Sequence, residues 1–389
     1  MSNFLMDNYN PLPVDFNEGS GPWLIDNKGD RYLDALSGIA VCGLGHSHPS
    51  ISKVIAEQSV KLIHTSNIYR IPYQEKLAKK LTILSGMDNA FFCNSGAEAN
   101  EAAIKLARLH ARNRKIDDPI IIVMQNSFHG RTMATISASG KRVQEGFKPL
   151  LDGFKHVPYN NVKVLETNVK SNNNVVAVMI EPIQGEGGIV VPDDNYLNSI
   201  RNICDENKLL MIVDEVQTGM CRTGKWFAYQ HEDILPDVVT IAKALGNGVP
   251  IGACLAKGEA ASYFLAGSHG STFGGNPLAS RVALEVVTIL EKDNINEHVA
   301  KLGSYFIKKL NKSIRDMRGI SDIRGKGLMI GIELEKNCPN LVTKALETKL
   351  LINVTSGNVI RLLPPLIMQE SEVDKVISIL TETLEEYLS

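Results

Sequence analysis

Four short apolar runs in the middle of the chain constrain its fold more than any other feature. They read PIIIVM, VVAVMIEP, LLMIVDEV and VVTIAKAL and lie between residues 119 and 245. Runs this short and this rich in Val and Ile are typical of strands buried on both faces. Helix-length segments such as DDNYLNSIRNICDENK separate them. The alternation predicts an α/β fold with a mainly parallel sheet covered by helices.

The pattern changes on both sides of this middle part. Residues 1–50 are rich in Gly, Pro and short strand-like pieces. Residues 276–389 hold two long helical segments and three strand candidates. Boundaries are therefore expected near residues 50 and 275, and 389 residues are enough for about two to three domains.

The net charge and the cysteine spacing limit the classes of partner and the cell compartment that we expect for this protein. The net charge of −2 gives no electrostatic reason to expect a nucleic acid or an anionic membrane surface. No window approaches the ~18 apolar residues of a membrane span, and the start lacks a signal-peptide pattern. The six cysteines form no C-x-x-C pair. We expect a cytoplasmic protein that acts on small molecules.

Three of the apolar runs stop at or beside an ionisable residue: Glu181, Asp214 and Lys243. One such charge usually reaches solvent, but three together predict a site, because ligands bind off the carboxyl ends of parallel strands. Asp214 follows five apolar residues, and an unpaired buried charge costs several kcal/mol. Its cation could be a distant side chain, such as Lys243, which comes 29 residues later, or could belong to a ligand.

The segment NSGAEANEAA predicts a phosphate site. Ser95 and Glu98 match a capping box, which is sufficient to explain those two residues. It does not explain Gly96 and Ala97, whose small side chains leave the first N–H groups of the helix open to an anion. A phosphate here, a ring nitrogen facing Asp214 and an aldehyde captured by Lys243 are the requirements for pyridoxal phosphate.

The motifs then show a family resemblance. NSGAEANEAAIKLAR, SFHGRT, EPIQGEGG, VDEVQTG, AKALGNGVPIGA and HGSTFGGNPLA occur in the order found in class III pyridoxal-phosphate aminotransferases. YLDALSGIAVCGLGHSHP and VIRLLPPL extend the resemblance over nearly the whole chain. It implies the fold-type I architecture, with a large cofactor-binding domain over residues 51–275. Residues 1–50 and 276–389 would form a smaller α+β domain, and a homodimer would share its active sites at the interface.

The resemblance also implies a role for each motif residue. Lys243 would form the Schiff base with the cofactor, and Asp214 would pair with the ring nitrogen. The remaining cofactor contacts would come from Ser95, Gly96, Ala97, Phe128, Glu215, Val216, Gln217 and, across the dimer interface, Thr272.

Four further residues would bind substrate. Arg131 would clamp a carboxylate, since Arg can hold it bidentately, and Ser271 would lie near the substrate. Arg361 lies inside the apolar segment NVIRLLPP, where an unpaired guanidinium would be costly. It would bind the α-carboxylate of the 2-oxo acid, and Glu186 would cover it when a substrate lacks that group.

The reaction implied is transamination of N2-acetyl-L-ornithine with 2-oxoglutarate, which gives N-acetyl-L-glutamate 5-semialdehyde and L-glutamate in arginine biosynthesis. Relatives that act on ornithine carry a Tyr at the position of Ile39, where its hydroxyl helps bind the free α-amino end. Ile39 offers no hydrogen bond, which favours an acylated amine. N-succinylornithine, an N-succinyl-diaminopimelate precursor, ornithine and 4-aminobutyrate stay as alternatives.

The histidines outside these roles are interpreted as structural residues. His46 and His48 lack a neighbouring ligand set, so we expect no metal. His129 is interpreted as a packing or dimer residue. A nicotinamide-dependent oxidoreductase would need a glycine fingerprint that the sequence lacks, and a non-catalytic binding protein would not need Lys243.

Overall fold

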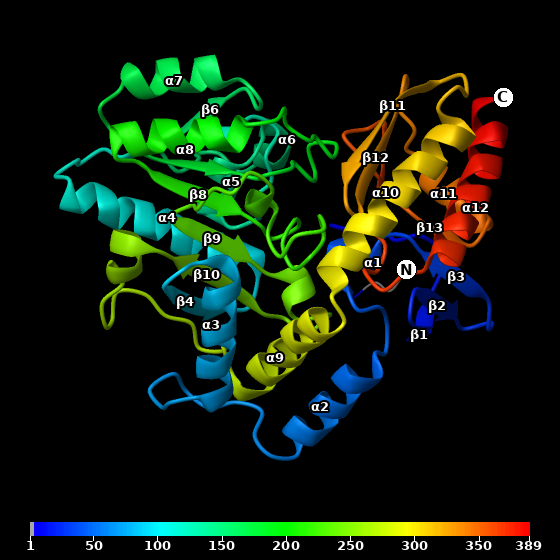
Figure 1. The fold of residues 1–389 in the computed structure, drawn as a ribbon, viewed down its shortest axis with the longest axis horizontal. Helices are drawn as coiled ribbons and strands as arrows, with labels where there is room; N and C mark the ends of the chain where they lie inside the picture. The colour runs from blue at the N-terminus through cyan, green and yellow to red at the C-terminus, as the bar shows by residue number, and fades with distance from the viewer. Residues whose placement is uncertain (1–3) are drawn as a thin grey trace.

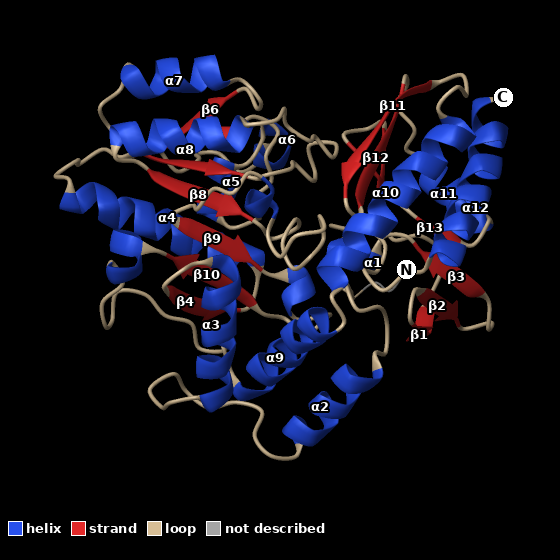
Figure 2. Ribbon diagram, in the orientation of Figure 1, coloured by secondary structure: helices blue, strands red, loops and turns tan. Residues whose placement is uncertain are grey.

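A seven-stranded sheet forms the larger part of the molecule (Figures 1 and 2). The computed structural model describes residues 4–389. The strand order is β4-β10-β9-β8-β7-β5-β6. Strands β5 to β9 pair in parallel, whereas β10 is antiparallel to both β4 and β9. The α/β class with a mostly parallel sheet is thus confirmed. The strands are β4 (Asn89–Cys93), β5 (Ile120–Met124), β6 (Phe154–Val157), β7 (Val175–Ile180), β8 (Leu210–Asp214), β9 (Val238–Ile241) and β10 (Gly252–Ala256).

Helices cover both faces of this sheet because the central strands are apolar on both faces. Every residue of β7, β8 and β9 is buried. Helix α4 (Gly96–Asn113) packs on one face through alanines such as Ala103, Ala107 and Ala111, whose small side chains allow a close approach. Helices α7 (Val162–Lys170) and α8 (Tyr196–Asn207) pack on the other face.

Both chain ends meet in the smaller part of the molecule (Figure 1). β13 (Leu350–Leu351) pairs in parallel with β3 (Arg31–Asp34), and β1 (Phe16–Ser20) and β2 (Trp23–Asp26) complete this sheet. A second sheet has the order β11-β12-β15-β14. The remaining elements here are β11 (Ile320–Lys326), β12 (Met329–Leu334), β14 (Asn353–Thr355), β15 (Val359–Leu362), α10 (Ile295–Ile314), α11 (Leu341–Glu347) and α12 (Glu370–Leu388).

Helix α9 (Pro277–Lys292) runs between the two parts and packs against α2 (Pro49–Ser59) and α3 (Pro72–Ser85). The domain limits at residues 50 and 275 stay a prediction. Within the described residues, no helix has both the length and the apolar character needed to cross a bilayer. The short elements are α1 (Ser37–Ala40), α5 (Met133–Ala138), α6 (Lys141–Gln144), η1 (Ala228–His231), η2 (Lys243–Leu245) and η3 (Gly258–Ser262).

Candidate active site

A cavity of about 450 Å³ opens at the carboxyl ends of β7, β8 and β9. This is the edge of a parallel sheet at which ligands are expected. Glu181, Asn100 and His129 contribute to its wall together with residues that the sequence predicted. The predicted residues that line it are Ser95, Gly96, Ala97, Phe128, Arg131, Glu186, Asp214, Val216, Gln217 and Lys243.

The first turn of α4 faces the cavity with small residues. Ser95 caps the helix, because its side chain accepts a hydrogen bond from the backbone N–H of Glu98 at 3.2 Å. The Glu98 carboxylate bonds Asn94 rather than the Ser95 backbone, so the predicted capping box is shifted by one residue. A Cβ on Gly96 would lie 2.7 Å from Val216, so only glycine allows this approach. The turn is therefore an open cradle for an anion.

Asp214 is 4% exposed at the end of β8 and has three hydrogen-bond donors. Its Oδ1 accepts from the Val216 backbone at 3.0 Å. Its Oδ2 accepts from Asn100 Nδ2 at 2.7 Å and contacts His129 Nδ1 at 2.8 Å. A carboxylate accepts about four hydrogen bonds, so one position remains for a further donor.

Asp214 thus has a basic partner within the protein, which is one of the alternatives left open by the sequence. The contact corrects the interpretation of His129, which is not merely a packing or dimer residue. Burial opposes protonation of His129, but the hydrogen bond to Asp214 and the charge of that carboxylate raise its pKa above the ordinary value. No sequence pattern indicates this pair, because the two residues lie 85 positions apart.

Lys243 begins η2, directly after β9 and Ala242. Its backbone φ of 46° lies in the left-handed region, which non-glycine residues rarely adopt and which is typical of functional sites. Burial, followed by the nearby Arg361 cation, lowers the pKa of Lys243 to about 8. Among the described residues, no carboxylate lies within 4.0 Å of its amine. The direct Asp214–Lys243 ion pair is therefore not formed, and the amine remains available.

Arg361 points from β15 toward the loop that follows β7. Its guanidinium is 1% exposed and pairs with the Glu186 carboxylate at 2.5 Å and with Asn353 at 2.8 Å. The hydroxyls of Thr355 and Ser356 hold the backbone carbonyl of Glu186. The structure thus brings Arg361 and Glu186 together as predicted, although Arg361 itself lies behind Glu186 rather than on the cavity wall.

Glu181 joins two walls of the cavity and was not given this role from sequence. Its carboxylate accepts hydrogen bonds from the backbone of Phe128 at 2.9 Å and of Gly185 at 3.1 Å. Burial raises the pKa of Glu181 to about 7. On the Phe128 side, the exposed Arg131 lies with its guanidinium carbon 5.6 Å from the centre of the Phe128 ring. Glu181 therefore fixes the loop that presents Arg131.

Besides Arg361, three predicted site residues lie off the cavity wall in this chain. The Glu215 carboxylate bonds Thr218 at 2.5 Å and the Tyr229 backbone at 3.0 Å instead of lining the cavity, and a cofactor contact of this residue stays a prediction. Ser271 accepts hydrogen bonds from Asn94 and Gly274. Thr272 is exposed. The roles of Ser271 and Thr272 across an interface stay predictions.

Ile39, on which the substrate argument depends, also lies off this wall. Its side chain is partly buried against a small apolar cluster that includes Ile183 and Ile189. Val41 lines the cavity instead.

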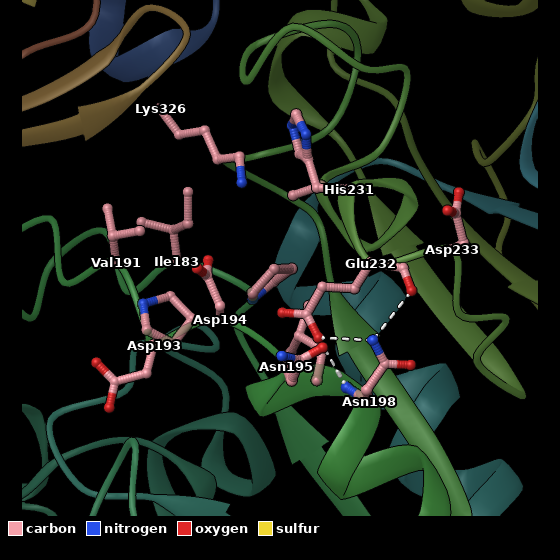
Figure 3. A pocket seen from close by; sticks show the side chains of 14 residues that line it. Ile183, Val191, Asp193, Asp194, Asn195, Asn198, His231, Glu232, Asp233 and Lys326 are labelled. Atoms are coloured by element: carbon pink, nitrogen blue, oxygen red, sulfur yellow. Dashed lines mark hydrogen bonds between the residues drawn. The ribbon is translucent and has the colours of Figure 1, made fainter.

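A second hollow of about 470 Å³ also borders the loop that follows β7 (Figure 3). Lys326 extends over it from the end of β11, and Asn198 bonds Glu232 at 3.1 Å on its floor. No predicted site residue lines it among the residues that the structure describes. The carboxylate of Asp214, the amine of Lys243 and the anion cradle at Gly96 all belong to the first cavity.

The residues that line the first cavity fit pyridoxal phosphate. The helix turn at Gly96 is open to an anion, Asp214 has one acceptor position left, and Lys243 has a lowered pKa. Gln217 has a buried side-chain oxygen with no partner within residues 4–389, so its amide is available to a ligand. These features suit a phosphate, a ring N–H and an aldehyde, respectively, with Gln217 free for a further ring substituent.

Comparisons with known proteins agree with this site. The family model described as aminotransferase class-III matches residues 4–384. An acetylornithine aminotransferase of Nitrosomonas europaea is 53% identical over 375 residues, which cover 96% of this chain and 95% of the relative. One of Methanocaldococcus jannaschii is 49% identical, with 97% of this chain and 95% of the relative covered.

Solved structures are similar over the same extent. The ornithine aminotransferase of Toxoplasma gondii has a TM-score of 0.95 at 33% identity and covers 99% of this chain and 94% of its own. The acetylornithine aminotransferase of Elizabethkingia anophelis has a TM-score of 0.88 at 36% identity, with 98% and 96% covered.

Proposed function

Because this chain belongs to the class-III aminotransferase family, a family of pyridoxal-phosphate-dependent enzymes, we propose that it transfers the δ-amino group of N2-acetyl-L-ornithine to 2-oxoglutarate. The products are N-acetyl-L-glutamate 5-semialdehyde and L-glutamate, a step of arginine biosynthesis. The observation that carries the proposal is the grouping of Lys243, Asp214 and Glu186 with its Arg361 partner around one cavity. The relatives that are acetylornithine aminotransferases support the choice of substrate.

Pyridoxal phosphate would be held by three parts of the chain. The backbone of Gly96 and Ala97 would bind its phosphate, Asp214 its ring nitrogen, and Phe128 and Val216 would pack on its two faces. When bound, the cofactor supplies an aldehyde that takes up amino groups and a protonated ring that withdraws electrons from the reacting carbon. The open turn at Gly96 and the remaining acceptor position on Asp214 support this assignment.

Lys243 is the proposed base and acid of the reaction. Its amine would hold the aldehyde of the cofactor between turnovers and would be free to move protons while substrate is bound. With a pKa of about 8, a useful fraction is neutral near pH 7 to 8 and can remove the proton from the carbon that bears the amino group. The charged form can return a proton. A lysine with the ordinary pKa of ~10.4 would be almost entirely protonated at this pH.

The Arg361–Glu186 pair would let one cavity accept two substrates in turn. The donor reacts at its δ-amino end and brings no carboxylate close to the reacting carbon, so Glu186 can stay on Arg361. 2-Oxoglutarate carries a carboxylate beside its reacting carbon, and this group would replace Glu186 on the guanidinium. The 37% exposure of the Glu186 side chain supports its ability to swing away.

Arg131 would bind the far carboxylate of either substrate from the cavity mouth. Its exposure and its position over Phe128 support that role. Val41 lines the neighbouring wall and Ile39 lies close to it in sequence, and neither side chain offers a hydrogen-bonding group to a free α-amino end. This favours an acylated amine such as acetylornithine over ornithine.

We propose a homodimer as the working form. Exposed apolar side chains occur in residues 60–69 and next to Thr272, and are taken together here as one patch: Val60 at 84%, Ile63 at 54%, Ile68 at 80%, Tyr69 at 65% and Phe273 at 61%. Asn67 bonds the carbonyls of Ser271 and Gly274, so the two segments of the patch are neighbours. A patch of this kind is typical of a protein interface. Burial here would bring Thr272 toward the phosphate and Ser271 toward the substrate of the partner.

We also propose a cytoplasmic location. All six cysteines are free, and five of them are buried. Free thiols are usual in reducing compartments. The amino-acid substrates are also metabolites of the cell interior.

A substrate panel tests the proposal. Purified protein loaded with pyridoxal phosphate is assayed with 2-oxoglutarate and each of acetylornithine, N-succinylornithine, ornithine and 4-aminobutyrate. We expect acetylornithine to exceed ornithine and 4-aminobutyrate by at least ~10-fold in kcat/KM, or ~1.4 kcal/mol. Equal rates would remove the argument from Ile39, and a preference for N-succinylornithine would assign the related alternative.

A further inference from the structure

Asn100 is a buried polar residue in the cavity wall that the proposed mechanism does not use. It is 1% exposed and lies on α4, four residues after Gly96. The same helix therefore presents its N-terminus to one end of the cavity and the Asn100 side chain to the other. A buried amide is costly unless its hydrogen bonds are satisfied, so its partners indicate what it does.

Both protons of the Asn100 amide are used. Nδ2 donates to Asp214 Oδ2 at 2.7 Å and to the backbone carbonyl of His129 at 2.7 Å. Oδ1 accepts from the Thr240 hydroxyl at 2.7 Å. The opposite orientation of the amide would set its oxygen against a carboxylate and a carbonyl, which are both acceptors. The amide therefore has one orientation, and Thr240 stabilises it.

Thr240 is placed for this task by the sheet. It lies on β9 directly beside Asp214 on β8, as the parallel register pairs the two residues. Its side chain is fully buried. The order Thr240, Asn100, Asp214 thus forms a chain of hydrogen bonds across two strands and a helix.

We propose that Asn100, oriented by Thr240, is a positioning residue that holds Asp214 and His129 in the geometry needed to receive the ring nitrogen of the cofactor. This inference rests on the proposed function of the site. Asn100 and His129 fill two acceptor positions on Asp214 Oδ2, and Val216 fills one on Oδ1. Without Asn100 the carboxylate could rotate, and the remaining position would no longer point at one place.

A double-mutant cycle tests whether Asn100 acts through Asp214. We expect Asn100→Ala to lower kcat/KM per cofactor-loaded site by ~30-fold and to weaken binding of pyridoxal phosphate to the apoprotein by ~10-fold. In an Asp214→Asn background the same change should cost less than ~3-fold in both quantities. Equal losses in both backgrounds would overturn the proposal, as would an Asn100→Ala protein with normal turnover and normal cofactor binding.

Thr240 gives a second route if Asn100→Ala does not fold. Thr240→Val has the same shape but no hydroxyl, and we expect it to lower kcat/KM by ~5-fold and to show the same dependence on Asp214. Thr240→Ser keeps the hydroxyl and should recover to within ~2-fold of wild type. Thr383→Val removes a buried hydroxyl far away on α12, where it bonds Ile379. It should lower thermal stability without changing turnover, and a Thr240→Val protein that behaves in the same way would contradict the proposal.

The outcomes separate this inference from the proposed function. If wild-type protein bound pyridoxal phosphate but did not transaminate acetylornithine, the substrate assignment would fail while the cofactor-binding arm still tested Asn100. If Asp214→Asn changed neither quantity, the role of Asp214 itself would fall, and with it any action of Asn100 through that carboxylate.

Discussion

Asp214 and Arg361 are both buried charged residues on strands, yet their partners differ in kind. Asp214 has three donors from α4, a loop and its own strand end, and the two of them that are side chains, Asn100 and His129, are themselves at most 2% exposed. Arg361 has as its main partner Glu186, whose side chain is 37% exposed on a loop. One end of the cavity is fixed by hydrogen bonds inside the protein. The other is closed by a carboxylate that can leave.

This difference matches what each end would have to do. A cofactor stays bound through both half-reactions, so its carboxylate partner gains from a single orientation. Two substrates with different charges alternate at the other end, so a fixed partner there would reject one of them. A pair in which an exposed carboxylate covers a buried cation meets both demands, because a substrate carboxylate can replace it without leaving the cation unpaired.

The largest expected effect is at the fixed end. Lys243→Ala removes the amine with a pKa of about 8, and we expect both half-reactions to slow by at least ~10³-fold. Stopped-flow spectra of each half-reaction measure this directly. Turnover within ~10-fold of wild type would show that another group moves the proton.

At the exchangeable end we expect a loss in only one half-reaction. Arg361→Lys keeps the charge but not the planar fork, so the half-reaction with 2-oxoglutarate should fall by ~10²-fold in kcat/KM. The half-reaction with acetylornithine should stay within ~3-fold, because Arg361 is covered by Glu186 during it. The unaffected half-reaction is also the control for correct folding. Equal losses in both would remove the distinction between the two ends.

A smaller effect concerns pH at the fixed end. The lowered pKa of Lys243 means that its amine gains its neutral, nucleophilic form as pH rises through about 8. Capture of pyridoxal phosphate by the apoprotein should therefore rise ~10-fold between pH 7 and 9 and then level off. An amine with the ordinary pKa of ~10.4 would give a rise of nearly ~100-fold over that range without levelling.

The sequence predicted those parts of the molecule in which the local residue pattern has a single physical explanation. β7, β8 and β9 are recognisable because strands buried on both faces need continuous apolar runs. β10 reads GACLA and β6 reads FKHV, and neither has a run of Val and Ile that would mark a strand. Their places in the sheet follow from tertiary pairing, which a local pattern does not contain.

The residues of the site also divide into those that the sequence could predict and those that it could not. Gly96, Asp214 and Lys243 were identifiable because each is unusual for its local setting. The partnership of Asp214 with Asn100 and His129 joins residues 114 and 85 positions apart, so no spacing could indicate it. Glu215 was assigned to the cofactor by its motif, but its carboxylate caps η1 through the Tyr229 backbone instead. A motif identifies a residue without giving the direction of its side chain.

Single-turnover kinetics of the two half-reactions, measured in parallel for Asp214→Asn and Glu186→Gln, test the contrast between the two ends most directly. Asp214→Asn should slow both half-reactions by a similar factor of ~10² or more, because the cofactor partner serves both. Glu186→Gln should uncover the charge of Arg361, so that 2-oxoglutarate binds ~3- to 10-fold more tightly while the acetylornithine half-reaction weakens. If Glu186→Gln instead shifted both half-reactions in the same direction and by the same factor, Glu186 would not be an exchangeable cover, and the contrast between the two ends would be wrong.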